Sequence, residues 1–63
     1  MNVGIIGLGT MGSAYAYHLI KNNFTVYGIE PNKRNAEVFK NYGGKLITNY
    51  NHLFLNSDFI ITS

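Results

Sequence analysis

Short apolar runs alternate along this chain with segments whose apolar residues recur at helical spacing. The run from Val3 to Ile6 has no polar interruption, which is typical of a strand buried on both faces of a parallel sheet. From Thr10 to about Lys21 the spacing is helical, and Asn22-Asn23 ends the helix because asparagine tolerates left-handed backbone. Phe24 to Ile29 predicts a second strand. The apolar positions of the predicted helix are Met11, Ala14, Tyr15, Ala16, Leu19 and Ile20.

The second half of the chain repeats this alternation. Pro31 ends the second strand and suits a helix start, because its φ is preset and it has no amide hydrogen to lose. Gly43-Gly44 ends the helix that follows, and either Asn49 or Asn51 is a candidate cap for a further short helix. The remaining predicted elements are a helix over 32–42, a strand over 45–48, a short helix containing 52–55 and a strand over 58–63.

The predicted order of elements is β-α-β-α-β-α-β. Alternating strands and helices imply parallel strands joined by right-handed crossovers, which is the α/β class. The order fits the first half of a Rossmann-type doubly wound parallel sheet. We therefore expect residues 1–63 to form the N-terminal part of a dinucleotide-binding domain. The rest of that domain and any substrate domain are expected to lie outside this sequence.

Composition and charge narrow the possible partners. Hydrophobic residues make up 46% of the chain and charged residues 13%, below the ~25% of an average domain, so we expect further protein around the strands. The net charge is +2, and the basic residues are dispersed apart from Lys33-Arg34, so no nucleic-acid partner is expected. The chain has no cysteine, which excludes thiolate metal sites. No signal or membrane-spanning segment is predicted, and the cytoplasm is the default location.

The main motif is Gly7-Leu8-Gly9-Thr10-Met11-Gly12, which matches G-x-G-x-x-G between a predicted strand and a predicted helix. In this context the first glycine allows a sharp turn, the second allows close approach of a pyrophosphate, and the third allows tight helix packing. The expected donors are the backbone N–H groups from Leu8 to Met11, with the Thr10 hydroxyl in addition. No lysine follows at P-loop spacing, so phosphoryl transfer is not indicated.

Glu30 stands about 20 positions after the glycine turn, at the end of the second predicted strand. A carboxylate there accepts hydrogen bonds from the adenosine ribose hydroxyls and repels a 2′-phosphate, which favours NAD over NADP. Lys33 and Arg34 follow closely and could reach such a phosphate, although a solvated first helical turn is the simpler interpretation. His18 and His52 have no nucleophile or metal partner in the pattern, so no catalytic residue and no metal site are predicted.

The segment from Val3 to Ala14 closely resembles the start of the β-hydroxyacid dehydrogenases, which include 3-hydroxyisobutyrate dehydrogenase, tartronate semialdehyde reductase and 6-phosphogluconate dehydrogenase. The signature of that family is G-L-G-x-M-G, so Leu8 and Met11 make the match more specific. Asp58 to Thr62 also resembles the fourth strand of the family. Glu30-Pro31 stands where NADP-dependent members carry Asn-Arg, so the resemblance again favours NAD and adds Pro31 to the cofactor-binding residues.

The helix departs from the family pattern, because Tyr15 replaces a methionine and His18 replaces an asparagine. The resemblance implies hydride transfer between a nicotinamide cofactor and a small β-hydroxyacid substrate, and a homodimer of the full-length protein. The catalytic lysine of the family comes after the region that residues 1–63 cover, so the chain alone is expected to have no dehydrogenase activity. Two alternatives stay open: a regulatory NAD-sensing module without catalysis, and an imine reductase that shares this N-terminal half.

Overall fold

The computed structural model describes all 63 residues as alternating strands and helices, in the order predicted from the sequence. The elements are β1 (Asn2–Ile6), α1 (Thr10–Lys21), β2 (Thr25–Ile29), α2 (Lys33–Asn41), β3 (Lys45–Leu46), α3 (Tyr50–Asn56) and β4 (Phe59–Thr62). The third strand is shorter than predicted, because only Tyr27 and Gly28 of β2 pair with it.

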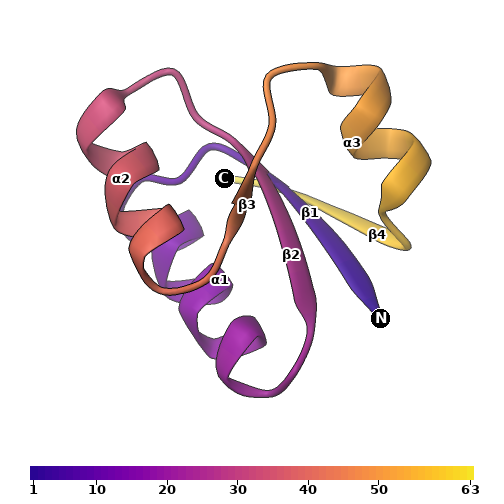
Figure 1. Cartoon of the computed structure of the whole chain (residues 1–63), viewed down its shortest axis with the longest axis horizontal. Helices are drawn as coiled ribbons and strands as arrows, with labels where there is room; N and C mark the ends of the chain where they lie inside the picture. The colour runs from indigo at the N-terminus through magenta and orange to yellow at the C-terminus, as the bar shows by residue number, and fades with distance from the viewer.

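The strands form one parallel sheet in the order β3-β2-β1-β4. Val3 in β1 lies opposite Val26 in β2 and Phe59 in β4, so β1 is paired on both sides. Helices α1 and α2 cover one face of the sheet and α3 covers the other (Figure 1). The arrangement confirms the α/β class and the doubly wound half-sheet. Because all strands are parallel, the segments that follow β1, β2 and β4 meet at the same edge.

The hydrophobic core lies between the sheet and the helices α1 and α2. It consists of Val3, Ile5, Leu8, Ala16, Val26 and Phe39. Phe39 from α2 has no exposed surface, and Leu53 from α3 is equally buried on the opposite face. Burial of these aromatic and aliphatic side chains is the main favourable contribution to the free energy of folding.

The buried side of α1 differs from the predicted apolar set. The helix buries Gly12 and Ala16, whereas Met11 and Tyr15 are 64% and 44% exposed. Ala14 is also exposed, and only Leu19 and Ile20 of the larger residues pack partly against the core. The reason is that small residues allow α1 to lie close to the sheet, which turns the large side chains of its first half outward.

The helix ends follow local sequence chemistry. Asn23 adopts a positive φ of 70° after α1, which confirms the predicted helix end. Asn32 caps α2 by accepting a hydrogen bond from the Asn35 N–H at 3.0 Å. Pro31 therefore precedes the cap and does not occupy the first helical turn as expected. Asn49, rather than Asn51, caps α3 by accepting from the His52 N–H at 3.1 Å.

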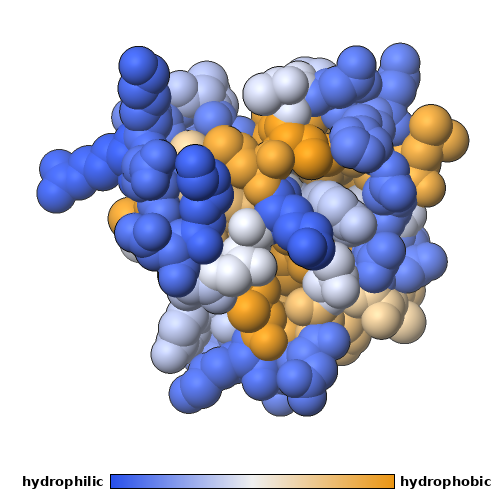
Figure 2. Space-filling model, in the orientation of Figure 1, coloured by the Kyte–Doolittle hydropathy of each residue, from blue (hydrophilic) through white to orange (hydrophobic).

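The surface combines polar and apolar regions. Figure 2 shows hydrophilic residues over α2, at the left of the view, and uncovered apolar side chains between α2 and α3. None of the helices has both the length and the apolar composition that crossing a lipid bilayer requires.

Candidate functional site

The glycine turn connects the end of β1 to the start of α1 and is held from two sides. Gly7 has a φ of 90°, a conformation that glycine adopts without steric cost. Its N–H donates to the Ile29 carbonyl at 3.0 Å, which ties the turn to β2. Its carbonyl accepts from the Ser63 hydroxyl at 2.6 Å, which ties the turn to the residue after β4. The turn is thus part of the sheet edge.

Gly9 and Gly12 face different surroundings. A Cβ atom at Gly12 would overlap the Gly7 carbonyl oxygen and the Ser63 hydroxyl, so the close packing of α1 requires glycine there. A Cβ atom at Gly9 would meet nothing within 4 Å. Gly12 is therefore explained by the packing of the protein, whereas the absence of a side chain at Gly9 leaves open space beside the turn.

The start of α1 presents a row of backbone N–H groups that have no acceptor in the protein. Gly9 occupies the cap position and has no side chain to satisfy them, and the first turn contains no acidic residue. The N–H groups of Gly9, Thr10, Met11 and Gly12 make no hydrogen bond with the backbone or with a side chain. Asparagine side chains cap both other helices. Such free amides, together with the helix dipole, form a site suited to an anion.

Glu30 lies directly beside this turn. Its Oε1 atom accepts from the Leu8 N–H at 2.6 Å, and its Oε2 atom accepts from the Asn32 N–H at 2.9 Å. The structure thus differs from the expectation that the Leu8 N–H is a free donor, because neighbouring parallel strands bring Glu30 within reach of it. The Leu8 side chain is only 1% exposed and belongs to the core. Glu30 itself is half-buried, and a carboxylate has about four lone-pair positions, so it can accept further hydrogen bonds.

A cavity of about 260 Å³ adjoins Glu30 at the carboxyl edge of β2 and β3. It is lined by Ile29, Glu30, Pro31, Leu46, Ile47, Thr48 and Tyr50. Lys33 and Arg34 are exposed at the start of α2 and form no ion pair, since the single ion pair of the chain joins Lys40 to Glu37 at 3.4 Å. The cavity therefore combines apolar walls with one carboxylate at its rim.

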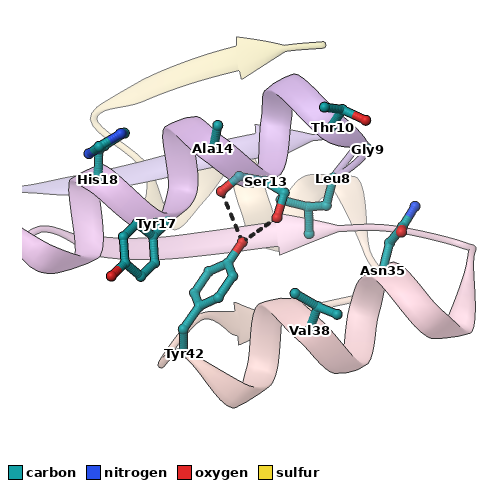
Figure 3. Close-up of a pocket in the computed structure, with 10 residues that line it drawn as sticks. All are labelled: Leu8, Gly9, Thr10, Ser13, Ala14, Tyr17, His18, Asn35, Val38 and Tyr42. Atoms are coloured by element: carbon teal, nitrogen blue, oxygen red, sulfur yellow. Dashed lines mark hydrogen bonds between the residues drawn. The ribbon is translucent and has the colours of Figure 1, made fainter.

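A second groove, of about 460 Å³, begins at Gly9 and Thr10 and runs between α1 and α2 (Figure 3). Tyr42 reaches across it from α2 and donates to the Ser13 carbonyl at 3.0 Å, while the two hydroxyl groups lie 2.7 Å apart. The Tyr17 ring packs edge-on against Tyr42, with ring centroids 5.6 Å apart. The hydroxyl groups of Ser13 and Tyr42 are thus hydrogen-bonded within the protein. Neither Glu30 nor Pro31 lines this groove.

The histidines lie on α1 and α3, outside the glycine turn. His18 is exposed on α1 and packs edge-on against the Tyr17 ring, and His52 is exposed on α3. The chain brings together no group of three or more His, Cys, Asp or Glu side chains that could hold a metal ion. His18 lines the groove between α1 and α2 together with Thr10 and Ser13, but neither imidazole makes a hydrogen bond.

Ser63 is a site residue that the sequence pattern did not single out. Its hydroxyl contacts the Gly7 carbonyl, and its N–H donates to the Ile6 carbonyl at 3.0 Å. The position could have been found from its place directly after a predicted strand, because ligands of doubly wound sheets bind outside the carboxyl ends of the strands.

Comparison with known proteins agrees with this geometry. Residues 2–63 match the model of a family described as the NAD binding domain of 6-phosphogluconate dehydrogenase. Among solved structures, the chain is similar to the V8 variant of an imine reductase from Myxococcus stipitatus in complex with NAD+, with a TM-score of 0.91 and 26% sequence identity. That similarity covers 98% of this chain but only 21% of the imine reductase. No curated protein sequence matches the chain.

Proposed function

The chain belongs to the family of the 6-phosphogluconate dehydrogenase NAD-binding domain, and from this we propose that it binds NAD as the N-terminal part of an oxidoreductase. The observation that carries the proposal is the row of unpartnered N–H groups at the start of α1. In the proposed complex, the amides of Gly9, Thr10, Met11 and Gly12 donate to the pyrophosphate and the Thr10 hydroxyl adds a further donor. The open space at Gly9 allows the pyrophosphate to approach the backbone.

The adenosine half of NAD is assigned to the neighbouring carboxyl edge. The Glu30 carboxylate accepts from the ribose hydroxyls, while the purine occupies the cavity beside Pro31, Ile47 and Tyr50. A phosphate on the ribose would bring negative charge against Glu30, and like charges at such short range repel strongly. This charge supports NAD as the cofactor and makes NADP the weaker ligand.

The unpaired edge of the sheet supports the proposal that the domain extends beyond these residues. β4 is a terminal strand of the sheet, and its Phe59 and Ile60 are 59% and 38% exposed. An apolar groove of about 400 Å³ adjoins them, and apolar strand edges of this kind are normally covered. The groove is lined by Met1, Val3, Leu19, Phe24, Phe59, Ile60 and Ile61.

For the full-length protein we propose hydride transfer between NAD and a small β-hydroxyacid, with the catalytic residues outside the present chain. The similarity to an imine reductase favours an imine as the second candidate substrate. A regulatory module that senses NAD without catalysis is the alternative from another class. Hydride-transfer activity of the full-length protein, measured by loss of NADH absorbance with hydroxyacid or imine substrates, discriminates between an enzyme and a sensor.

Titration with NADH and NADPH tests the cofactor assignment. We expect NADH to bind about tenfold or more tightly than NADPH, because one unfavourable charge contact of about 1.4 kcal/mol corresponds to tenfold in affinity. The matched variant Lys33→Ala/Arg34→Ala removes two exposed cations and should leave the NADH affinity within about twofold. Tighter binding of NADPH would overturn the NAD assignment, and binding of neither would overturn the proposal of a dinucleotide site.

A further inference from the structure

The Glu30 carboxylate connects two loops that are distant in the sequence. One oxygen binds the N–H of Leu8 in the glycine turn and the other binds the N–H of Asn32 before α2. The Leu8 contact, at 2.6 Å, is short and charge-assisted, and such hydrogen bonds are about twice as strong as neutral ones. Both contacts are made between groups of the protein itself, so they can shape the site to which NAD would bind.

From this contact we infer that Glu30 positions the pyrophosphate-binding turn, in addition to accepting the ribose hydroxyls; the inference rests on the proposed function. The turn is otherwise held at Gly7, through Ile29 and Ser63, and Leu8 is the next residue toward the free amides. Holding the Leu8 N–H against Glu30 fixes the direction in which the following amides point. A site fixed in its bound conformation before association loses less conformational entropy on binding.

The two possible roles of Glu30 have opposite effects on the affinity for ligands that lack ribose hydroxyls. A Glu30 that served only the ribose would lower the affinity of ligands without ribose hydroxyls, because its negative charge repels the diphosphate. Its removal would then strengthen the binding of such ligands. A Glu30 that positions the turn raises their affinity through the Leu8 contact, so removal of its acceptor atoms weakens their binding.

The test compares ADP with 2′,3′-dideoxy-ADP, which keeps the adenine and the diphosphate but has no ribose hydroxyls. The protein variants are Glu30→Gln and Glu30→Ala. Both remove the negative charge, but only glutamine keeps a carbonyl oxygen that can accept from the Leu8 N–H. Calorimetric titration of the full chain with each nucleotide therefore isolates the Leu8 contact from the charge.

We expect Glu30→Gln to bind dideoxy-ADP about fivefold more tightly than Glu30→Ala. This difference corresponds to the free energy of the one neutral hydrogen bond that glutamine retains. Equal affinities of the two variants for dideoxy-ADP, with ADP binding weakened in both, would overturn the inference and leave the proposed function intact. Failure of the wild-type chain to bind ADP, dideoxy-ADP or NAD would instead overturn the proposed function.

A second measurement examines the contact without any ligand. In NMR spectra of the free chain, the Leu8 amide proton should be shifted strongly downfield and should move upfield in Glu30→Ala more than in Glu30→Gln. An unshifted Leu8 amide in the wild type would overturn the inference.

If Glu30→Ala does not fold, Glu30→Asp replaces it, because aspartate keeps the charge but is one methylene too short to hold both loops. The expected result is then weaker dideoxy-ADP binding by Glu30→Asp than by the wild type.

Discussion

Gly9 and Gly12 belong to the same turn, yet a Cβ atom at Gly9 would meet nothing within 4 Å, whereas one at Gly12 would overlap the carbonyl oxygen of Gly7. The two glycines therefore meet different demands. Gly12 is required by the packing of α1 on the sheet edge in the protein alone. Gly9 has no such requirement, and we propose that its lack of a side chain serves the close approach of a ligand.

Alanine substitution separates these two demands. We expect Gly9→Ala to change the free energy of unfolding by less than about 1 kcal/mol, the scale of a cap substitution, while weakening NAD binding about tenfold. Gly12→Ala should lower the free energy of unfolding by about 1–3 kcal/mol, as overpacking does. Urea denaturation and calorimetric titration measure the two effects. A Gly9→Ala variant that is as unstable as Gly12→Ala would contradict the assignment.

The cap of α3 provides a second matched pair. Asn49→Ala should lower the free energy of unfolding by about 1 kcal/mol, because it removes the acceptor of the His52 N–H. Asn51→Ala changes an exposed residue inside the same helix, where alanine is the better helix former, so its effect should be neutral or slightly stabilising. Thermal denaturation of both variants checks this. Equal losses of stability would show that the Asn49 contact contributes nothing.

The hydrogen bonds between Tyr42 of α2 and Ser13 of α1 should contribute to stability but not to cofactor affinity. Tyr42→Phe removes the hydroxyl that contacts both polar atoms of Ser13, which should lower the free energy of unfolding by about 1–2 kcal/mol. NAD affinity should stay within about twofold, because the hydroxyl contacts only Ser13 and none of the free amides of α1. Tyr15→Phe is the control, since Tyr15 is exposed and makes no hydrogen bond through its side chain. A large loss of NAD binding in Tyr42→Phe would place the interhelical groove within the cofactor site.

The order of elements could be predicted because its signals are local. A buried strand, the glycine turn and the stop at Asn23 are each encoded within a few residues, and the structure places them where the pattern predicts. The apolar spacing of α1 did not identify its buried side, because Met11 and Tyr15 share that spacing but are exposed. Which side of a helix is buried depends on how closely the helix approaches its neighbours, and Gly12 and Ala16 decide that distance here.

The chemistry at the sheet edge depended on contacts between distant residues. Leu8 and Glu30 are 22 positions apart, and Gly7 and Ser63 are 56 positions apart, so no local pattern reports their hydrogen bonds. Parallel pairing of β1 with β2 and β4 brings these residues together, because the carboxyl ends of parallel strands meet at one edge. The spacing of apolar and glycine residues thus specifies the elements and the glycine turn. Only the packed sheet determines that Glu30 binds the Leu8 amide, that Ser63 holds Gly7, and which N–H groups of the turn have no acceptor in the protein.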